Sequence, residues 1–103
     1  LGISAQINNF LHIIINNSSH DSVGGQPTLG KTLNLGEIGK NFGYKTCYSI
    51  SKKNQLIKIL SKCIKSQKSS LVVINCDKGG RKDLGRPEKN MRKRKDIFLR
   101  YKN

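Results

Sequence analysis

Short apolar runs alternate along the chain with segments whose apolar residues follow helical spacing. Three runs contain many β-branched residues and predict strands: residues 10–15 (FLHIII), 45–50 (KTCYSI) and 69–76 (SSLVVINC). The first and third runs are almost continuously apolar, which is typical of strands that are buried on both faces.

A first helix is predicted between the first and second strands. Asn34 can cap this helix, with Glu37 reaching back from the third position, and Gly43 can end it in the left-handed conformation. Gly36 and Gly39 weaken the helix, so we expect close packing against the rest of the fold to hold it.

The helix between the second and third strands has a clearer pattern. Ser51 is its predicted cap, and its apolar residues form one stripe, consisting of Leu56, Ile57, Ile59, Leu60, Cys63 and Ile64. Lysines 58, 62 and 65 fall on the solvent side of this helix. A last helix is predicted within residues 93–102 (KRKDIFLRYK), with Ile97, Phe98 and Tyr101 facing inward.

The order strand, helix, strand, helix, strand predicts an α/β fold with a parallel sheet and flanking helices in one domain, residues 1–103. In such sheets, ligands bind outside the carboxyl ends of the strands. Residues 16–28 (NNSSHDSVGGQPT) directly follow the first strand, so we expect them to form part of a site at that place.

The formal net charge of +14 is unevenly distributed. Residues 1–30 contain no Lys or Arg, whereas residues 90–103 (NMRKRKDIFLRYKN) are dense with both. Basic blocks often bind nucleic acid, but Lys outnumbers Arg 15 to 5, and the chain lacks aromatic interleaving of the kind that stacks bases. Compositional bias explains the charge equally well, so nucleic-acid binding is the less favoured interpretation.

The cysteines and the apolar runs indicate the compartment in which we expect the chain to fold. The chain has an odd number of cysteines, Cys47, Cys63 and Cys76, and no CxxC pair. We therefore expect these cysteines to be small core residues of a protein in the reducing cytoplasm. No apolar run approaches the roughly 20 residues of a membrane span, and no membrane partner is expected.

The segment after the first strand has the chemistry of a cation and phosphate site. An asparagine side-chain oxygen is a neutral ligand suited to Mg²⁺, and Gly-containing loops expose backbone N–H groups to phosphate. The sequence NNSS followed by SVGG can therefore form half of a magnesium-diphosphate cradle, although the same residue types also form simple polar turns. His12, inside the strand, is expected to be a packed core residue.

Four segments are distinctive in sequence and in order: residues 10–28 (FLHIIINNSSHDSVGGQPT), 38–45 (IGKNFGYK), 78–87 (KGGRKDLGRP) and 95–101 (KDIFLRY). Together they resemble the phosphonopyruvate decarboxylase family of thiamine-diphosphate-dependent enzymes. This resemblance implies thiamine diphosphate and Mg²⁺ as cofactors and the conversion of 3-phosphonopyruvate to phosphonoacetaldehyde and CO₂ in phosphonate biosynthesis. Sulfopyruvate decarboxylase is a close relative, so sulfopyruvate is an alternative substrate.

The resemblance also assigns roles to individual residues. It implies that Asn17 binds Mg²⁺ through its side chain and Ser19 through its backbone carbonyl. The cofactor diphosphate is implied to lie beside His20, Asp21, Ser22, Val23, Gly24 and Gly25, with residues 23–26 closing over it. Candidate substrate-binding residues are Arg81, Lys82 and Arg86, for which solvent exposure or an interface role is the alternative.

The chain also departs from the family pattern. The Gly-Asp-Gly triplet that opens the metal motif is absent from these 103 residues, as is the pyrimidine-binding domain. We therefore expect the C-terminal part of a diphosphate-binding domain, inactive alone and complemented by a pyrimidine-binding domain or subunit in a homo-oligomer that takes a small 2-oxo acid. Ser18 replaces the glycine that usually follows the motif asparagine, which questions whether the turn keeps a left-handed residue. A non-catalytic basic module that binds nucleic acid is the alternative from another class.

Overall fold

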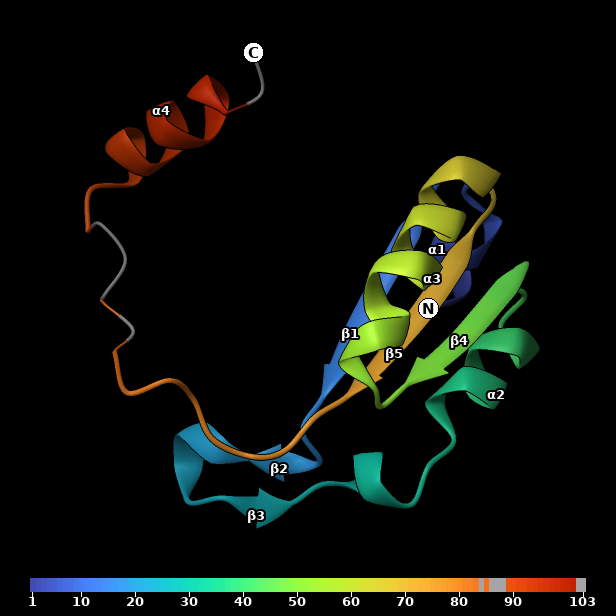
Figure 1. Ribbon diagram of the computed structural model, residues 1–103, viewed down its shortest axis with the longest axis horizontal. Helices are drawn as coiled ribbons and strands as arrows, with labels where there is room; N and C mark the ends of the chain where they lie inside the picture. The colour runs from blue at the N-terminus through green and yellow to red at the C-terminus, as the bar shows by residue number, and fades with distance from the viewer. Residues whose placement is uncertain (84, 86–88, 102–103) are drawn as a thin grey trace.

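The computed structural model describes residues 1–83, 85 and 89–101 and confirms an α/β fold built on a parallel sheet. The sheet has three strands in the order β1 (Leu11–Asn16), β5 (Ser70–Asn75) and β4 (Thr46–Ile50) (Figure 1). β1 and β4 both pair with β5 in parallel, so the last strand in the sequence is the central one. The three predicted strands are thus confirmed within one residue at each end.

Helices and short segments complete the fold. The helices are α1 (Gly2–Gln6), α2 (Leu35–Asn41), α3 (Lys53–Ser66) and α4 (Met91–Arg100). Between β1 and α2 lie the two-residue strands β2 (Ser19–His20) and β3 (Gln26–Pro27) and the 3₁₀ turns Asp21–Val23 and Leu29–Lys31.

The core has one part on each face of the sheet. On the face of α1 and α2, the buried residues are Ala5, Tyr44, Leu71 and Val73. On the face of α3, they are Ile50, Cys63 and Val72. His12 is partly buried, and its Nδ1 lies 2.7 Å from the Tyr44 hydroxyl, which confirms it as a packed residue.

The local signals for α2 are largely confirmed. The Asn34 Oδ1 accepts a hydrogen bond from the Glu37 N–H at 3.1 Å, and Gly43 follows the helix with φ of +95°. The Glu37 side chain does not reach back to the cap as expected, because it instead pairs with the Lys40 ammonium at 2.6 Å. Gly39 is buried where an added Cβ would overlap Leu71 of β5, which is the close packing expected for this helix.

The prediction for the start of α3 was wrong. The helix begins at Lys53 and not directly after Ser51, because the chain stays extended through Lys52 (φ −117°, ψ 127°). Its N-cap Lys52 makes no side-chain capping bond, since a lysine ammonium only donates hydrogen bonds and cannot accept one from the first turn. The apolar stripe was also drawn too wide, since Ile57 and Ile64 are exposed. Lys58, Lys62 and Lys65 are exposed as predicted, and the Lys62 Nζ lies 5.5 Å from the centre of the Tyr48 ring on β4.

Two predictions of burial were also wrong. β1 is not buried on both faces, because it forms an edge of the sheet and exposes Ile13 and Ile15. Cys63 is buried and Cys47 is half-buried, as expected of core cysteines, but Cys76 is exposed because it lies beyond the last residue of β5.

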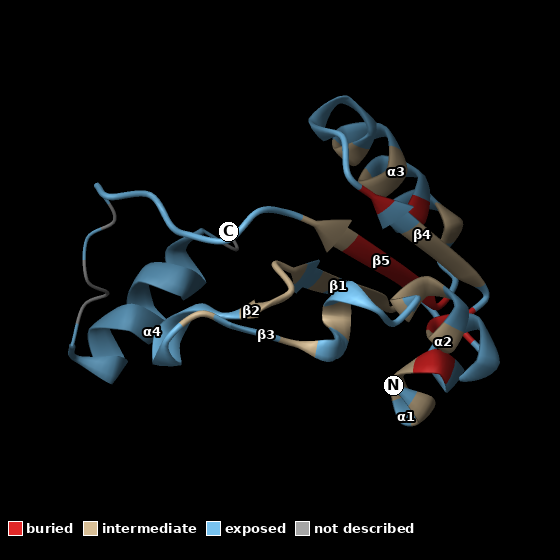
Figure 2. Cartoon of the chain, turned by 90° about the horizontal axis from the view of Figure 1, so that it is seen from below, coloured by how far each residue is buried: buried red, intermediate tan, exposed pale blue. Residues whose placement is uncertain are grey.

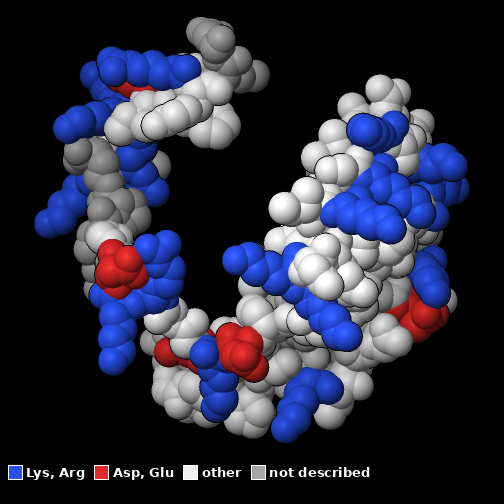
Figure 3. All heavy atoms as spheres, in the orientation of Figure 1, with Lys and Arg blue, Asp and Glu red and all other residues white. Residues whose placement is uncertain are grey.

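The C-terminal part of the chain forms an arm that leads from β5 to α4 (Figure 1). Contrary to the prediction, Ile97, Phe98 and Tyr101 do not face inward, since the arm places α4 away from the sheet and all three side chains are exposed (Figure 2). Lys and Arg side chains gather along the arm and over α3, whereas the region of β1 to β3 carries few (Figure 3). In the part of the chain that the structure describes, no helix is long and apolar enough to cross a membrane.

Candidate functional site

The turn after β1 is held by the side chains of two consecutive asparagines. The Asn16 Oδ1 accepts the Ser18 N–H at 3.1 Å, while its Nδ2 donates to the Gly30 carbonyl at 2.8 Å and to the Asn75 Oδ1 at 3.1 Å. These bonds tie the turn to both the following loop and the end of β5. Ser18 has φ of +54°, so the turn keeps its left-handed residue although serine replaces glycine.

Asn17 lies at the mouth of this turn. Its Oδ1 accepts the Ser19 N–H at 3.1 Å, and its Nδ2 donates to the Asp21 Oδ2 at 2.9 Å. A carbonyl oxygen has two lone pairs, so one remains on the Asn17 Oδ1 for a cation. The Ser19 hydroxyl is shielded from solvent and makes no hydrogen bond of normal geometry. It nevertheless lies close enough to Asp21 to lower the pKa of that carboxyl group.

Asp21 joins this turn to the loop after β5. Its Oδ2 accepts the backbone N–H of Gly79 at 2.9 Å, in addition to the bond from Asn17. The Gly79 N–H is the main reason that the pKa of Asp21 lies below its ordinary value, and the Asn17 amide and the charge of Lys78 lower the pKa further. The carboxylate is therefore the form that holds the two loops together.

A cavity of about 360 Å³ opens at the carboxyl ends of β1 and β5, beside this turn. Its lining combines the predicted metal ligand with two cations and an acid, and consists of Asn17, Ser18, Pro27, Lys31, Cys76, Asp77 and Lys78. Asn17 thus lines a cavity at the strand ends, the place where the sequence predicted a site, and its role as a metal ligand stays a prediction. Our sequence reasoning missed Lys31 and Lys78, and the signal for Lys78 was its position two residues after Cys76, at the end of the third predicted strand.

The segment from His20 to Gly25 forms the tip of a small hairpin. β2 and β3 pair antiparallel, and the Gly25 N–H donates to the His20 carbonyl at 3.0 Å. Gly24 and Gly25 both have positive φ, at 108° and 72°, and an added Cβ on Gly24 would come within 2.9 Å of the Gln26 side chain. This sharp tip therefore requires the glycine pair, and it carries Ser22 and Val23 at its exposed end.

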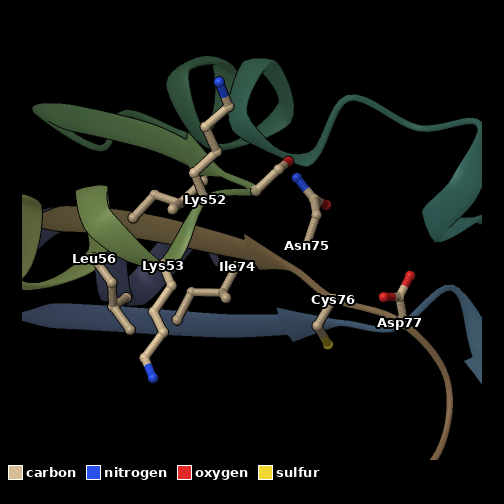
Figure 4. A pocket seen from close by; sticks show the side chains of 9 residues that line it. Lys52, Lys53, Leu56, Ile74, Asn75, Cys76 and Asp77 are labelled. Carbon is tan, nitrogen blue, oxygen red and sulfur yellow. The ribbon is translucent and has the colours of Figure 1, made fainter.

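A second cavity, of about 510 Å³, lies on the β4 side of the same sheet edge (Figure 4). Its residues come from the end of β4, the start of α3 and the end of β5, and they are Ile50, Ser51, Lys52, Lys53, Leu56, Ile74, Asn75, Cys76 and Asp77. Cys76 and Asp77 line both cavities, which makes the two cavities neighbours at the strand ends.

The candidate substrate residues lie further along the chain. Arg81 is exposed and donates from Nε to the Asp83 Oδ1 at 2.9 Å, and this ion pair raises the pKa of Arg81. Lys82 is also exposed, and neither residue lines the two cavities at the strand ends. Arg86 lies outside the described residues.

The cavity beside the turn combines one residue of a type that hard cations accept with two positively charged residues. Asn17 offers a neutral amide oxygen of the kind that Mg²⁺ accepts, and Lys31 and Lys78 bring positive charge to the same cavity. Within the described ranges, no group of three or more His, Cys, Asp or Glu residues is placed to hold a metal ion.

Comparisons with known proteins agree with the resemblance in the sequence. The chain is 29% identical over 80 residues to phosphonopyruvate decarboxylases from Streptomyces viridochromogenes and from Streptomyces hygroscopicus. Each alignment covers 78% of this chain and 20% of the relative, so the chain spans about a fifth of the length of these curated relatives. No family model matches the chain, and no solved structure matches it either.

Proposed function

We propose that the chain supplies part of the diphosphate-binding domain of a thiamine-diphosphate-dependent decarboxylase that acts on 3-phosphonopyruvate. The position of Asn17 carries this proposal, because this residue lines a cavity at the carboxyl ends of two parallel strands. The similarity to two phosphonopyruvate decarboxylases supports the substrate, and the parallel α/β sheet supports the type of domain.

Each residue of the site has a role in this proposal. Asn17 would hold Mg²⁺ through its Oδ1 and Ser19 through its backbone carbonyl, while Asp21 keeps the turn in place through its bonds to Asn17 and Gly79. Gly24 and Gly25 bring backbone without side chains to the hairpin tip, so that the main chain of residues 20–25 can approach a diphosphate closely.

The positive charges at this edge have a separate role. Lys31 and Lys78 line the cavity and offset the negative charge of a diphosphate and of an anionic substrate. When bound, thiamine diphosphate supplies the electron sink that decarboxylation requires, and this chain's residues bind and orient it. A pyrimidine-binding domain or subunit completes the active site in this proposal.

The test is cofactor binding by the complete protein with Asn17 replaced. Isothermal titration calorimetry with thiamine diphosphate is run with and without Mg²⁺ on wild type, Asn17→Ala and a matched control, Asn54→Ala, which changes an exposed asparagine in α3. We expect Asn17→Ala to lose at least about tenfold in Mg²⁺-dependent affinity and Asn54→Ala to bind as wild type does.

Two results would contradict the proposal. If the wild-type protein does not bind thiamine diphosphate in the presence of Mg²⁺, the function is wrong. If Asn17→Ala binds as tightly as Asn54→Ala, Asn17 is not a ligand. Decarboxylation of 3-phosphonopyruvate and of sulfopyruvate, compared at equal concentrations, then decides the substrate.

A further inference from the structure

The carboxyl edge of the sheet carries a row of hydrogen-bonded side chains that crosses all three strands. Asn16 ends β1, Asn75 ends β5, and these two residues are paired in the sheet register. The Asn16 Nδ2 donates to the Asn75 Oδ1 at 3.1 Å, and the Asn75 Nδ2 donates to the Ser49 Oγ of β4 at 2.9 Å. We call these three residues the polar row.

The polar row lies on the face of the sheet that α2 covers. Asn75 is two residues after Val73, so both side chains point to the same face, and Val73 belongs to the core cluster there. Figure 4 shows Asn75 on the opposite side of β5 from Ile74, which packs toward α3. Asn16 and Asn75 are partly buried, and together with Ser49 they line a cavity of about 250 Å³. The amides of the row are therefore partly shielded from competing water.

The bonding partners leave the Asn16 side chain one orientation. Both N–H groups of its Nδ2 are used, one by the Gly30 carbonyl and one by the Asn75 Oδ1. Its Oδ1 accepts the Ser18 N–H. Turning the amide over would set its N–H groups against the Ser18 N–H and its oxygen against the Gly30 carbonyl. Because Asn75 supplies one of the two acceptors, it helps to hold the Asn16 oxygen toward Ser18.

The Asn16 oxygen in turn controls the backbone around Asn17. Its bond to the Ser18 N–H spans Asn17, and Ser18 has φ of +54°. This left-handed conformation is unfavourable for a residue with a Cβ, so the surrounding bonds must hold it. A weaker Asn16 bond should let Ser18 leave the left-handed region. Asn17 precedes Ser18 and Ser19 follows it, so both proposed ligands of Mg²⁺ would then move.

We propose that Asn75 is a positioning residue, which sets the turn of the Mg²⁺ ligands through the Asn16 amide. This inference rests on the proposed function, because the turn affects cofactor binding only if Asn17 and Ser19 hold the metal. Asn75 lines the two neighbouring cavities but not the one that Asn17 lines, so it acts through Asn16. The Cys76 N–H also donates to the Asn16 carbonyl, at 3.0 Å. The backbone therefore keeps the two strands together when the Asn75 side chain is changed.

Cofactor binding by the complete protein tests this role. Asn75→Leu replaces the amide by an apolar side chain of similar volume. The matched control Thr46→Val removes a cross-strand bond at the opposite end of β4 and β5, where the Thr46 Oγ1 donates to the Ser70 Oγ at 2.8 Å. In calorimetric titrations with thiamine diphosphate, we expect Asn75→Leu to lose at least about tenfold in Mg²⁺-dependent affinity and Thr46→Val to bind as wild type does.

Hydrogen–deuterium exchange of the complete protein without cofactor tests the turn itself. Mass spectrometry should show the peptide that contains Ser18 exchanging at least about fivefold faster in Asn75→Leu than in wild type. Asn75→Asp and Thr46→Val should exchange as wild type does, since a carboxylate at position 75 still accepts from the Asn16 Nδ2.

The two measurements separate failure of this inference from failure of the proposed function. Unchanged exchange at Ser18 in Asn75→Leu overturns the inference, whether or not the protein binds thiamine diphosphate. Faster exchange with an unchanged Mg²⁺-dependent affinity also overturns it, because Asn75 would then stabilise the turn without serving the site. A wild-type protein that binds no thiamine diphosphate overturns the proposed function, and the role of Asn75 in cofactor binding falls with it.

Discussion

The contact between α2 and the sheet makes a sharp prediction at two glycines of the same helix. An added Cβ on Gly39 would overlap the Leu71 side chain and would lie 3.2 Å from the Cys47 Sγ, whereas on Gly36 it would meet only the Asn34 Oδ1, at 3.4 Å. The perturbation is one methyl group in both variants, Gly39→Ala and Gly36→Ala. We expect opposite effects on the free energy of unfolding.

The magnitude follows from two terms. Replacing glycine by alanine in a helix contributes up to about 1 kcal/mol of stability, and less in the first turn, where Gly36 lies. Overpacking a core costs about 1–3 kcal/mol, and the upper part of this range applies to Gly39 because Leu71 is fully buried and has no room to move. Gly39→Ala should therefore lose about 1–2 kcal/mol, and Gly36→Ala should gain up to about 1 kcal/mol.

Urea denaturation followed by circular dichroism measures both variants against wild type, and the slope of each transition reports whether unfolding stays two-state. In a thermal scan, the loss at Gly39 should lower Tm by at least about 4 °C. If Gly39→Ala is as stable as Gly36→Ala, then α2 does not pack on β5 as closely as the structure shows, and our account of this helix is wrong.

Two further predictions concern the strand ends and the thiols. The pKa of Asp21 is lowered from 3.8, so its bond to the Gly79 N–H is present at neutral pH and is lost as the pH falls through the pKa of the folded state. In an NMR titration, the chemical shift of the Gly79 amide should change with a midpoint below 3.8. A midpoint at or above that value would contradict the bond. Cys76 is exposed, whereas Cys63 is buried and burial raises the pKa of Cys47. We therefore expect one thiol per native chain, that of Cys76, to react rapidly with a thiol reagent. A rapid phase that persists in Cys76→Ser would show that another thiol is accessible.

The strands and α2 could be predicted because their signals are local. Short apolar runs bounded by polar turns are sufficient to predict β1, β4 and β5, and Asn34 and Gly43 mark the ends of α2 through capping geometry. The parallel arrangement followed from the order of elements alone. The same rule placed Asn17 at the strand ends, where the structure has it lining a cavity.

Features that depend on partners far along the chain could not be read in the same way. The β1 run has the composition of a central strand, but its place at the sheet edge depends on which strands are available to pair with it. Ile57 and Ile64 have the spacing of core residues, and only the lateral position of α3 leaves them exposed. The hydrogen bond between Asp21 and the Gly79 N–H joins segments that are 58 residues apart, and no local sequence pattern predicts it.

The outcome for α4 follows from the same limit. Its sequence predicted an amphipathic helix, and the helix is present over Met91–Arg100. Amphipathic spacing indicates that one side will be covered by something apolar, but it does not identify the covering surface. The sequence therefore predicted that α4 has an apolar side, but it wrongly predicted that this side packs against the chain's own core.

The strand order has a consequence for how the chain acquires its structure during synthesis. β1 and β4 emerge from the ribosome first, yet each has β5 as its neighbour in the sheet. Until β5 is translated, β1 and β4 lack the strand that lies between them in this sheet, and a product truncated before Ser70 cannot form the sheet. Assembly of this sheet therefore waits for its central strand, and apolar segments that are not yet paired are open to aggregation until β5 has been made.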